Sequence, residues 1–246
     1  MEALLAEVAP SVHRFGLRMC RNAADADDVL QDTLLAVTSH LGAFEGRSSL
    51  SSWVFTLART ACARRRRGLK NAPPVADDAT AERVSELHDP EQEASSRELS
   101  VALGRALDGL SDEYREVLVL RDIEGLSTDE AADATGLSAD ALKSRLHRAR
   151  SALRDALRPL LEPAQPASGA QCPAIAEIFS RKLEGELSQA DCAEMERHLA
   201  TCPACNAACD ALRTVLSACR RETGATVPKE VPARVRAAVA RWQRGT

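Results

Sequence analysis

Apolar side chains recur at helical spacing in three parts of the chain. Residues 1–67, 97–160 and 172–246 carry this pattern, and glycine and proline are rare within the first two stretches. Residues 68–96, which are acidic, and residues 161–171 contain several prolines and glycines and few large apolar groups, which is typical of linkers. The pattern predicts an all-α protein with two helical domains, a flexible linker between them, and a small helical C-terminal domain.

The first domain is predicted to contain an acidic amphipathic helix over residues 25–37. Its apolar stripe consists of Val29, Leu30, Thr33, Leu34 and Val37. The opposite face carries Asp27, Asp28, Gln31 and Asp32. After a loop over residues 42–52, a second helix points Trp53, Val54, Leu57 and Ala58 inward, and ends in four arginines at positions 64–67. Taken alone, these residues also fit a plain helical hairpin with solvated charges.

The second domain has the signals of a helix-turn-helix. Ser111 is expected to begin one helix, and the segment from Ser127 to Glu130 is a capping box that begins another. Gly136 suits the left-handed residue that ends this helix, and Ser138 caps the next one.

The helix after Ser138 has the layout of a DNA-recognition helix. Leu142, Leu146 and Leu153 are predicted to face the core. The basic and polar residues that remain for DNA are Lys143, Ser144, Arg145, His147 and Arg148. The alternative is a basic amphipathic helix that binds no nucleic acid. His147 is interpreted as facing DNA or solvent, without a role in metal binding.

The C-terminal domain contains six of the eight cysteines, namely Cys172, Cys192, Cys202, Cys205, Cys209 and Cys219. His198, Cys202 and Cys205 have the spacing with which the end of one helix and the start of the next hold a tetrahedral metal ion. Cys172 is expected to return across the hairpin as the fourth ligand. The alternatives are a set of small buried side chains or a Cys-x-x-Cys redox pair, although no βαβ pattern surrounds it.

Composition narrows the class of protein. The formal net charge of −4 excludes a globally basic nucleic-acid binder but leaves room for local basic patches. No apolar run reaches the roughly 20 residues that a membrane helix needs. The first ten residues have no basic residue and do not resemble a signal peptide, so we expect a cytoplasmic protein with reduced thiols. No phosphate loop or catalytic set is recognisable, which argues against an enzyme.

The order of elements in the first domain resembles region 2 of extracytoplasmic-function sigma factors, although this family often has an aromatic residue where Thr38 stands. The segment Lys-Ser-Arg-Leu-His-Arg-Ala-Arg at 143–150 resembles sigma region 4. The resemblance covers residues 1–158 and implies that the acidic helix binds core RNA polymerase through Asp27, Asp28, Gln31 and Asp32. It implies that residues 46–50 form a pocket for an unstacked base of the −10 element. The DNA around that pocket would be contacted by Arg47, Ser48, Arg59, Arg64 and Arg65. The recognition helix would read the −35 element.

The C-terminal domain resembles a zinc-binding anti-sigma domain fused to the sigma factor, as in CorE-type metal-dependent sigma factors. Such a domain has four metal ligands, and this chain adds three more cysteines, Cys192, Cys209 and Cys219. Additional thiolates suit Zn²⁺, Cd²⁺ or Cu(I). A Cys3His core favours zinc or cadmium over copper. The resemblance implies that metal binding controls the activity of the sigma factor, and that its target genes serve metal resistance. The open alternatives are a purely structural zinc tail, a thiol-redox sensor, and a helix-turn-helix regulator that works without polymerase. A last helix is predicted over residues 233–244.

Overall fold

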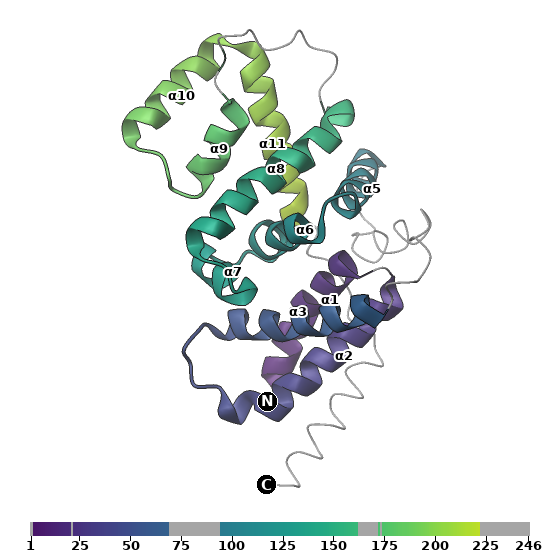
Figure 1. The fold of residues 1–246 in the computed structure, drawn as a ribbon. Coiled ribbons are helices and arrows are strands. Elements are labelled where there is room, and N and C mark those ends of the chain that lie inside the picture. The colour runs from purple at the N-terminus through teal and green to yellow at the C-terminus, as the bar shows by residue number, and fades with distance from the viewer. Residues whose placement is uncertain (1, 21, 69–93, 162–171, 173, 222–246) are drawn as a thin grey trace.

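A computed structural model describes residues 2–20, 22–68, 94–161, 172 and 174–221. Every regular element in these ranges is helical, as the sequence predicts. Figure 1 shows three layers stacked along the molecule: α1–α3 form the first domain, α5–α8 the second, and α9–α11 the C-terminal domain. No described helix is both long and apolar enough to span a bilayer.

The first domain packs α1 (Glu2–Met19) against α2 (Ala23–His40) and α3 (Leu50–Gly68), with a short 3-10 turn, η1 (Leu41–Ala43), after α2. The predicted apolar stripe of α2 is fully buried. Gly16 allows α1 and α2 to approach closely, because a Cβ there would lie 3.1 Å from Ala26. Ser49 caps α3 by accepting a hydrogen bond from the amide of Ser52 at 3.1 Å.

The second domain consists of α5 (Ala94–Asp108), α6 (Asp112–Leu118), the π-helical turn η2 (Val119–Ile123), α7 (Thr128–Thr135) and α8 (Ala139–Leu161). The predicted helix signals are confirmed: Ser111 caps α6, and the Ser127–Glu130 capping box starts α7. Gly136 ends α7 with a φ of 71°. Helix α5 begins inside the segment expected to be a linker, and residues 69–93 of that segment lie outside the described residues.

The C-terminal domain is a three-helix unit of α9 (Ile175–Leu183), α10 (Gln189–Thr201) and α11 (Pro203–Arg221). A capping box of Ser188 and Asp191 starts α10, and Pro203 lies in the first turn of α11. The predicted helix over 233–244 lies outside the described residues.

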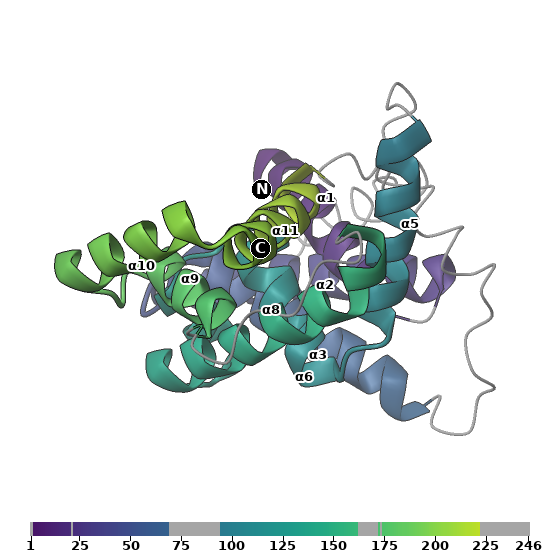
Figure 2. The same cartoon turned by 90° about the horizontal axis from the view of Figure 1, so that it is seen from above.

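The C-terminal domain is not separate from the rest of the protein. Helix α11 contacts α5, η2 and α8 as well as its own neighbours, and Figure 2 shows it running alongside α8. Its second half contributes Val215, Ala218 and Cys219 to the main apolar core that the first two domains share. The first half closes a smaller core around Phe179 and Met195.

Candidate metal centre and nucleic-acid interface

The structure brings together the four side chains predicted to hold a metal ion. One ligand atom from each of Cys172, His198, Cys202 and Cys205 lies within 4.8 Å of the others. The group lies where three helices meet, because Cys172 precedes α9, His198 is in the last turn of α10, and Cys205 is in the first turn of α11. The Sγ atoms of Cys172 and Cys202 are 3.7 Å apart.

The chemistry of this group fits a tetrahedral ion such as Zn²⁺. Nε2 of His198 is buried without a hydrogen-bond partner among the described residues, which is the state of an imidazole aimed at a metal. Hydrogen bonds from the backbone amide and thiol of Cys205 lower the pKa of Cys202, so one thiolate is favoured before any metal binds. Burial and the neighbouring Cys202 raise the pKa of Cys205 to about 12. A cation would offset that cost, because metal ligation deprotonates thiols.

The three additional cysteines do not join this group in the described residues. Cys209 lies one turn after Cys205 but is buried in the small apolar core, where burial raises its pKa. Cys219 is completely buried in the main core, and burial raises its pKa to about 12. Cys192 is half-buried on α10. A metal-sensing role for these three thiols stays a prediction.

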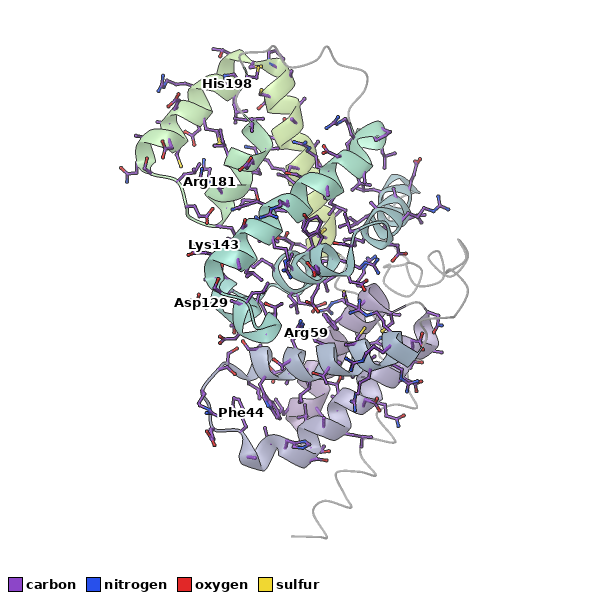
Figure 3. The ribbon with its side chains drawn as sticks, viewed as in Figure 1. Phe44, Arg59, Asp129, Lys143, Arg181 and His198 are labelled. Carbon is purple, nitrogen blue, oxygen red and sulfur yellow. The ribbon has the colours of Figure 1, made fainter. Side chains whose placement is uncertain are left out.

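The predicted recognition helix, α8, is partly covered by the C-terminal domain. His147 is held on both ring nitrogens: Nδ1 lies 2.8 Å from Ser180 Oγ, and Nε2 lies 2.8 Å from a carboxylate oxygen of Glu186. The Lys143 ammonium lies 3.6 Å from the same carboxylate. Figure 3 shows Lys143 on α8 with Arg181 of α9 above it. The expectation that His147 faces DNA or solvent therefore differs from the structure, because the loop after α9 occupies that face.

The other predicted contacts of α8 have different surroundings. Ser144 and Arg148 stay exposed and bond to each other, with the guanidinium 3.0 Å from the hydroxyl. Arg145 lies 3.5 Å from Glu113 of α6. Only part of the predicted DNA-reading surface is thus covered.

A buried ion network fixes the C-terminal domain to α8. Arg150 is 2% exposed and binds both carboxylate oxygens of Asp122, at 2.9 and 2.6 Å, and Glu184 at 2.9 Å. The Glu184 side chain is 0% exposed and also accepts from Arg121 and from the Thr128 hydroxyl. Burial alone would raise the pKa of Glu184, but the charges of Arg150 and Arg121 outweigh it and hold that pKa below its usual value. Glu184 is therefore a charged, fully paired carboxylate.

The π-helical turn η2 and Glu124, the residue that caps its end, direct three charged side chains at three different parts of the protein. Its extra residue per turn is visible in the bond from the Glu124 amide to the Val119 carbonyl, at 2.8 Å. Arg121 reaches the C-terminal domain, Asp122 reaches α8, and Glu124 accepts from Arg14 of α1 at 2.6 and 3.0 Å. All three domains are thus joined through one short turn.

The predicted −10 and polymerase contacts of the first domain are partly occupied by other residues of the chain. Arg59 of α3 bonds to Glu116 at 2.8 and 3.0 Å and to the Ala134 carbonyl at 2.7 Å, so it lies between the first two domains (Figure 3). Arg65 pairs with Asp28 at 2.6 Å. Asp27 lies 3.1 Å from the buried His13. Gln31 and Asp32 are half-buried on α2, and Arg64 is exposed.

The loop predicted to hold a melted base is exposed at Gly46 and Arg47 and half-buried at residues 48–50. Gly46 has a φ of 69°, which permits its sharp turn, and Arg47 pairs with Glu45 in solvent at 3.1 Å. The Ser48 hydroxyl contacts the next carbonyl at 3.4 Å. Below the loop, the rings of Phe44 and Trp53 pack with centroids 5.2 Å apart. This pair supports the loop on α3, and we did not predict the role of Phe44 from sequence.

Sequence reasoning also missed Glu184, Glu186 and the π-helical turn. Gly185 lies just after the end of α9 and has a φ of 70°, which suits a glycine at a helix end. An acid on each side of such a glycine was the available signal. It does not reveal a partner, because the partners lie more than 30 residues earlier in the chain.

Comparison with protein families agrees with this architecture. The Sigma-70 region 2 model matches residues 4–71, and the Sigma-70, region 4 model matches residues 100–153. A third model, described as "Putative zinc-finger", matches residues 172–206. The first two matches define a transcription initiation factor of the sigma-70 class with a zinc-finger-like domain after it.

Individual relatives give the family more closely. The chain is 32% identical to the ECF RNA polymerase sigma factor EcfG of Rhodopseudomonas palustris, over 58% of this chain and 77% of that protein. It is 34% identical to the RNA polymerase sigma factor CarQ of Myxococcus xanthus, over 63% of this chain and 88% of that protein. The chain belongs to the ECF RNA polymerase sigma factors, which bind core RNA polymerase and promoter DNA and are not enzymes.

A solved structure has a similar fold. It contains the sigma factor RpoE of Bartonella quintana in complex with the anti-sigma factor NepR. The TM-score is 0.50 and the sequence identity 26%, over 63% of this chain and 95% of that one. The match therefore includes most of that chain but leaves more than a third of this one outside.

Proposed function

We propose that this ECF sigma factor is controlled by metal binding to its own C-terminal domain. The signal would be Zn²⁺ or Cd²⁺, with copper as a further candidate. The protein would act in the cytoplasm and would control metal-resistance genes. The proposal rests on one observation, namely that the metal group and the surface that covers α8 belong to the same domain. The domain that holds the Cys172–His198–Cys202–Cys205 group also covers the recognition helix.

Covering α8 would compete directly with promoter binding. Phosphate contacts from basic side chains supply much of the affinity of proteins for DNA. Glu186 places a carboxylate against Lys143 and His147, two of the residues expected to reach the −35 element. The C-terminal domain and the −35 element therefore exclude each other at this face. The related RpoE, solved with an anti-sigma factor, supports the idea that a protein partner can occupy this fold.

The metal group is positioned to change this contact. Its ligands tie together the start of α9, the end of α10 and the start of α11, and the loop from α9 to α10 carries Glu184 and Glu186. A bound ion would act as a cross-link that sets the angle between these helices. Control requires that the ion bind more tightly to the open arrangement than to the closed one, since equal affinity for both shifts nothing. Without the metal, the domain holds the sigma factor in the closed arrangement.

The test is a reporter driven by the target promoter and titrated with zinc, cadmium and copper in turn. The wild-type chain should respond to at least one metal, and Cys202→Ser should abolish the response. Cys209→Ser and Cys219→Ser separate the roles of the additional thiols. If both variants keep the metal response, those two thiols have no sensing role.

The same experiment discriminates the alternatives. A closed Cys3His set is also typical of structural zinc sites, and a purely structural tail would leave the reporter unchanged by any metal. A thiol-redox sensor would respond to diamide instead.

A further inference from the structure

Two thiols outside the metal group face each other in the core of the first domain. Cys20 follows the last residue of α1, and Cys62 lies in the middle of α3. Their Sγ atoms are 3.2 Å apart, and both residues are almost completely buried. They are 42 positions apart in sequence, so only the tertiary fold brings them together. Neither forms a disulfide in the structure.

The surroundings of the two thiols are unequal. Arg66 lies one turn after Cys62 on the same helix, and its charge favours a nearby thiolate. The hydrogen bond between the two thiols lowers the pKa of Cys62, and together with the charge of Arg66 it outweighs the effect of burial. The pKa of Cys20 is raised by that same hydrogen bond and by burial. This asymmetry favours Cys62 as the thiol of the pair that ionises first.

We propose that Cys20 and Cys62 form an oxidation site that a hydroperoxide converts into a disulfide. The proposal is independent of the metal group, because Cys20 and Cys62 belong to the first domain and the metal group consists of Cys172, His198, Cys202 and Cys205. A disulfide needs the sulfurs at roughly 2.05 Å, so the pair must close by little more than an ångström. The position of Cys20 at a helix end, rather than within α1, makes that small shift feasible.

The chemistry proceeds in two balanced steps. The Cys62 thiolate attacks one peroxide oxygen, the O–O bond breaks, and with one proton a sulfenic acid and a water (or, from an organic peroxide, an alcohol) result. Cys20 then attacks the sulfur of the sulfenic acid, the S–O bond breaks, and the Cys20 proton leaves with the hydroxide as a second water. Two thiols are oxidised by two electrons, and one peroxide is reduced.

The bond would enclose the elements expected to bind polymerase and the −10 element. The closed loop contains all of α2 and the loop at residues 46–50. A cross-link of this kind restricts the unfolded chain and ties α1 to α3. Oxidation should therefore raise the thermal stability of the first domain and leave the fold of α2 unchanged.

The experiment treats the zinc-loaded full chain with hydrogen peroxide, followed by alkylation and non-reducing tryptic digestion. Cleavage after arginine releases Cys20 in peptide 19–21 and Cys62 in peptide 60–64. We expect these two peptides as a linked species that dithiothreitol separates. Cys219, a single thiol that is equally buried, provides an internal control and should stay reduced in peptide 214–220. Linkage of Cys20 or Cys62 to a tail cysteine, or two free thiols after treatment of folded protein, would overturn the proposal.

Two variants test the order of attack. Cys20→Ser should trap the sulfenic acid on Cys62, visible as a dimedone adduct, whereas Cys62→Ser should give no adduct on Cys20. Peroxide should raise the melting temperature of the wild type by several degrees and that of Cys20→Ser not at all. An adduct on Cys20 in the Cys62→Ser chain would contradict the assigned roles. Because serine is nearly isosteric with cysteine, circular dichroism should confirm that both variants stay folded.

Discussion

The two surfaces expected to bind promoter DNA are obstructed in different ways. On α8, the C-terminal domain covers Lys143 and His147 and anchors itself through the buried Glu184. On α3, the obstruction comes from the sigma factor itself, because Arg59 bonds to α6 and α7 of the second domain. Arg64 and the loop at residues 46–50 are left uncovered or only partly covered. Under the proposed function, access of α8 to the −35 element would depend on the C-terminal domain, whereas access of Arg59 to the −10 element would depend on separating the first two domains.

The largest effect should come from Glu184→Ala. This change removes a fully buried carboxylate that pairs with Arg150 and Arg121, and breaking a buried pair costs about 3 kcal/mol or more. The docking equilibrium should shift by about 100-fold toward the open form. Hydrogen exchange of α9 amides should speed up, and a duplex with the target −35 element should bind more tightly in fluorescence anisotropy. Unchanged exchange in α9 would show that the buried network does not hold the domain.

Glu116→Gln should affect only the surface around Arg59, between the first two domains. It weakens the Arg59–Glu116 pair, which is partly exposed, so we expect a loss of about 1 kcal/mol in the packing of the first two domains. The variant keeps the Arg59 side chain, so the contact that Arg59 is expected to make with DNA is not removed. The radius of gyration in small-angle scattering should increase, whereas binding to the −35 duplex should stay at the wild-type level. Equal gains in −35 binding from this variant and from Glu184→Ala would mean that the two obstructions are a single one.

Glu186→Gln should have a smaller effect than Glu184→Ala, at the same surface. Its carboxylate is about a quarter exposed, and pairs near the surface contribute about 0.5–1 kcal/mol. We expect binding to the −35 duplex to tighten by roughly 2–5-fold. Glu194→Gln, on an exposed part of α10, is the matched control and should change nothing. Tightening as large as that of Glu184→Ala would place the main anchor at Glu186 instead.

Acidification should have the smallest effect on docking over the neutral range. The pKa of Glu184 is lower in the folded protein than in the unfolded chain, so its stabilisation is fully present above the unfolded value of about 4.3. It is lost only as the pH falls through the lower folded pKa. Protection of α9 amides, after correction for intrinsic exchange, should therefore not decrease as the pH falls from about 8 to 5.5. A drop within that range would show that a group other than Glu184 controls docking.

Local signals predicted much of the fold. Ser111, the Ser127–Glu130 box and Gly136 act within one or two helical turns, so their sequence spacing is enough to locate helix ends. The metal group could be predicted for the same reason, since three of its ligands lie within eight residues of each other.

Contacts between distant segments could not be predicted in this way. Helical periodicity left His147 and Lys143 on an outer face, which is correct for α8 alone, but periodicity does not show what covers that face. Cys209 and Cys219 are both in α11, yet they lie in different cores, because α11 extends beyond its own domain. The contact of Cys20 with Cys62 likewise depends on how α1 meets α3.

Residues 162–171 connect α8 directly to the domain that covers it. Under the proposed function, inhibitor and target are made in a fixed one-to-one ratio, so changes in expression level cannot unbalance them. A short connection typically gives an effective concentration on the order of millimolar, which promoter DNA in a cell does not reach. Dilution of the protein would therefore not release the recognition helix. The output of such a factor would report the metal rather than the amount of protein.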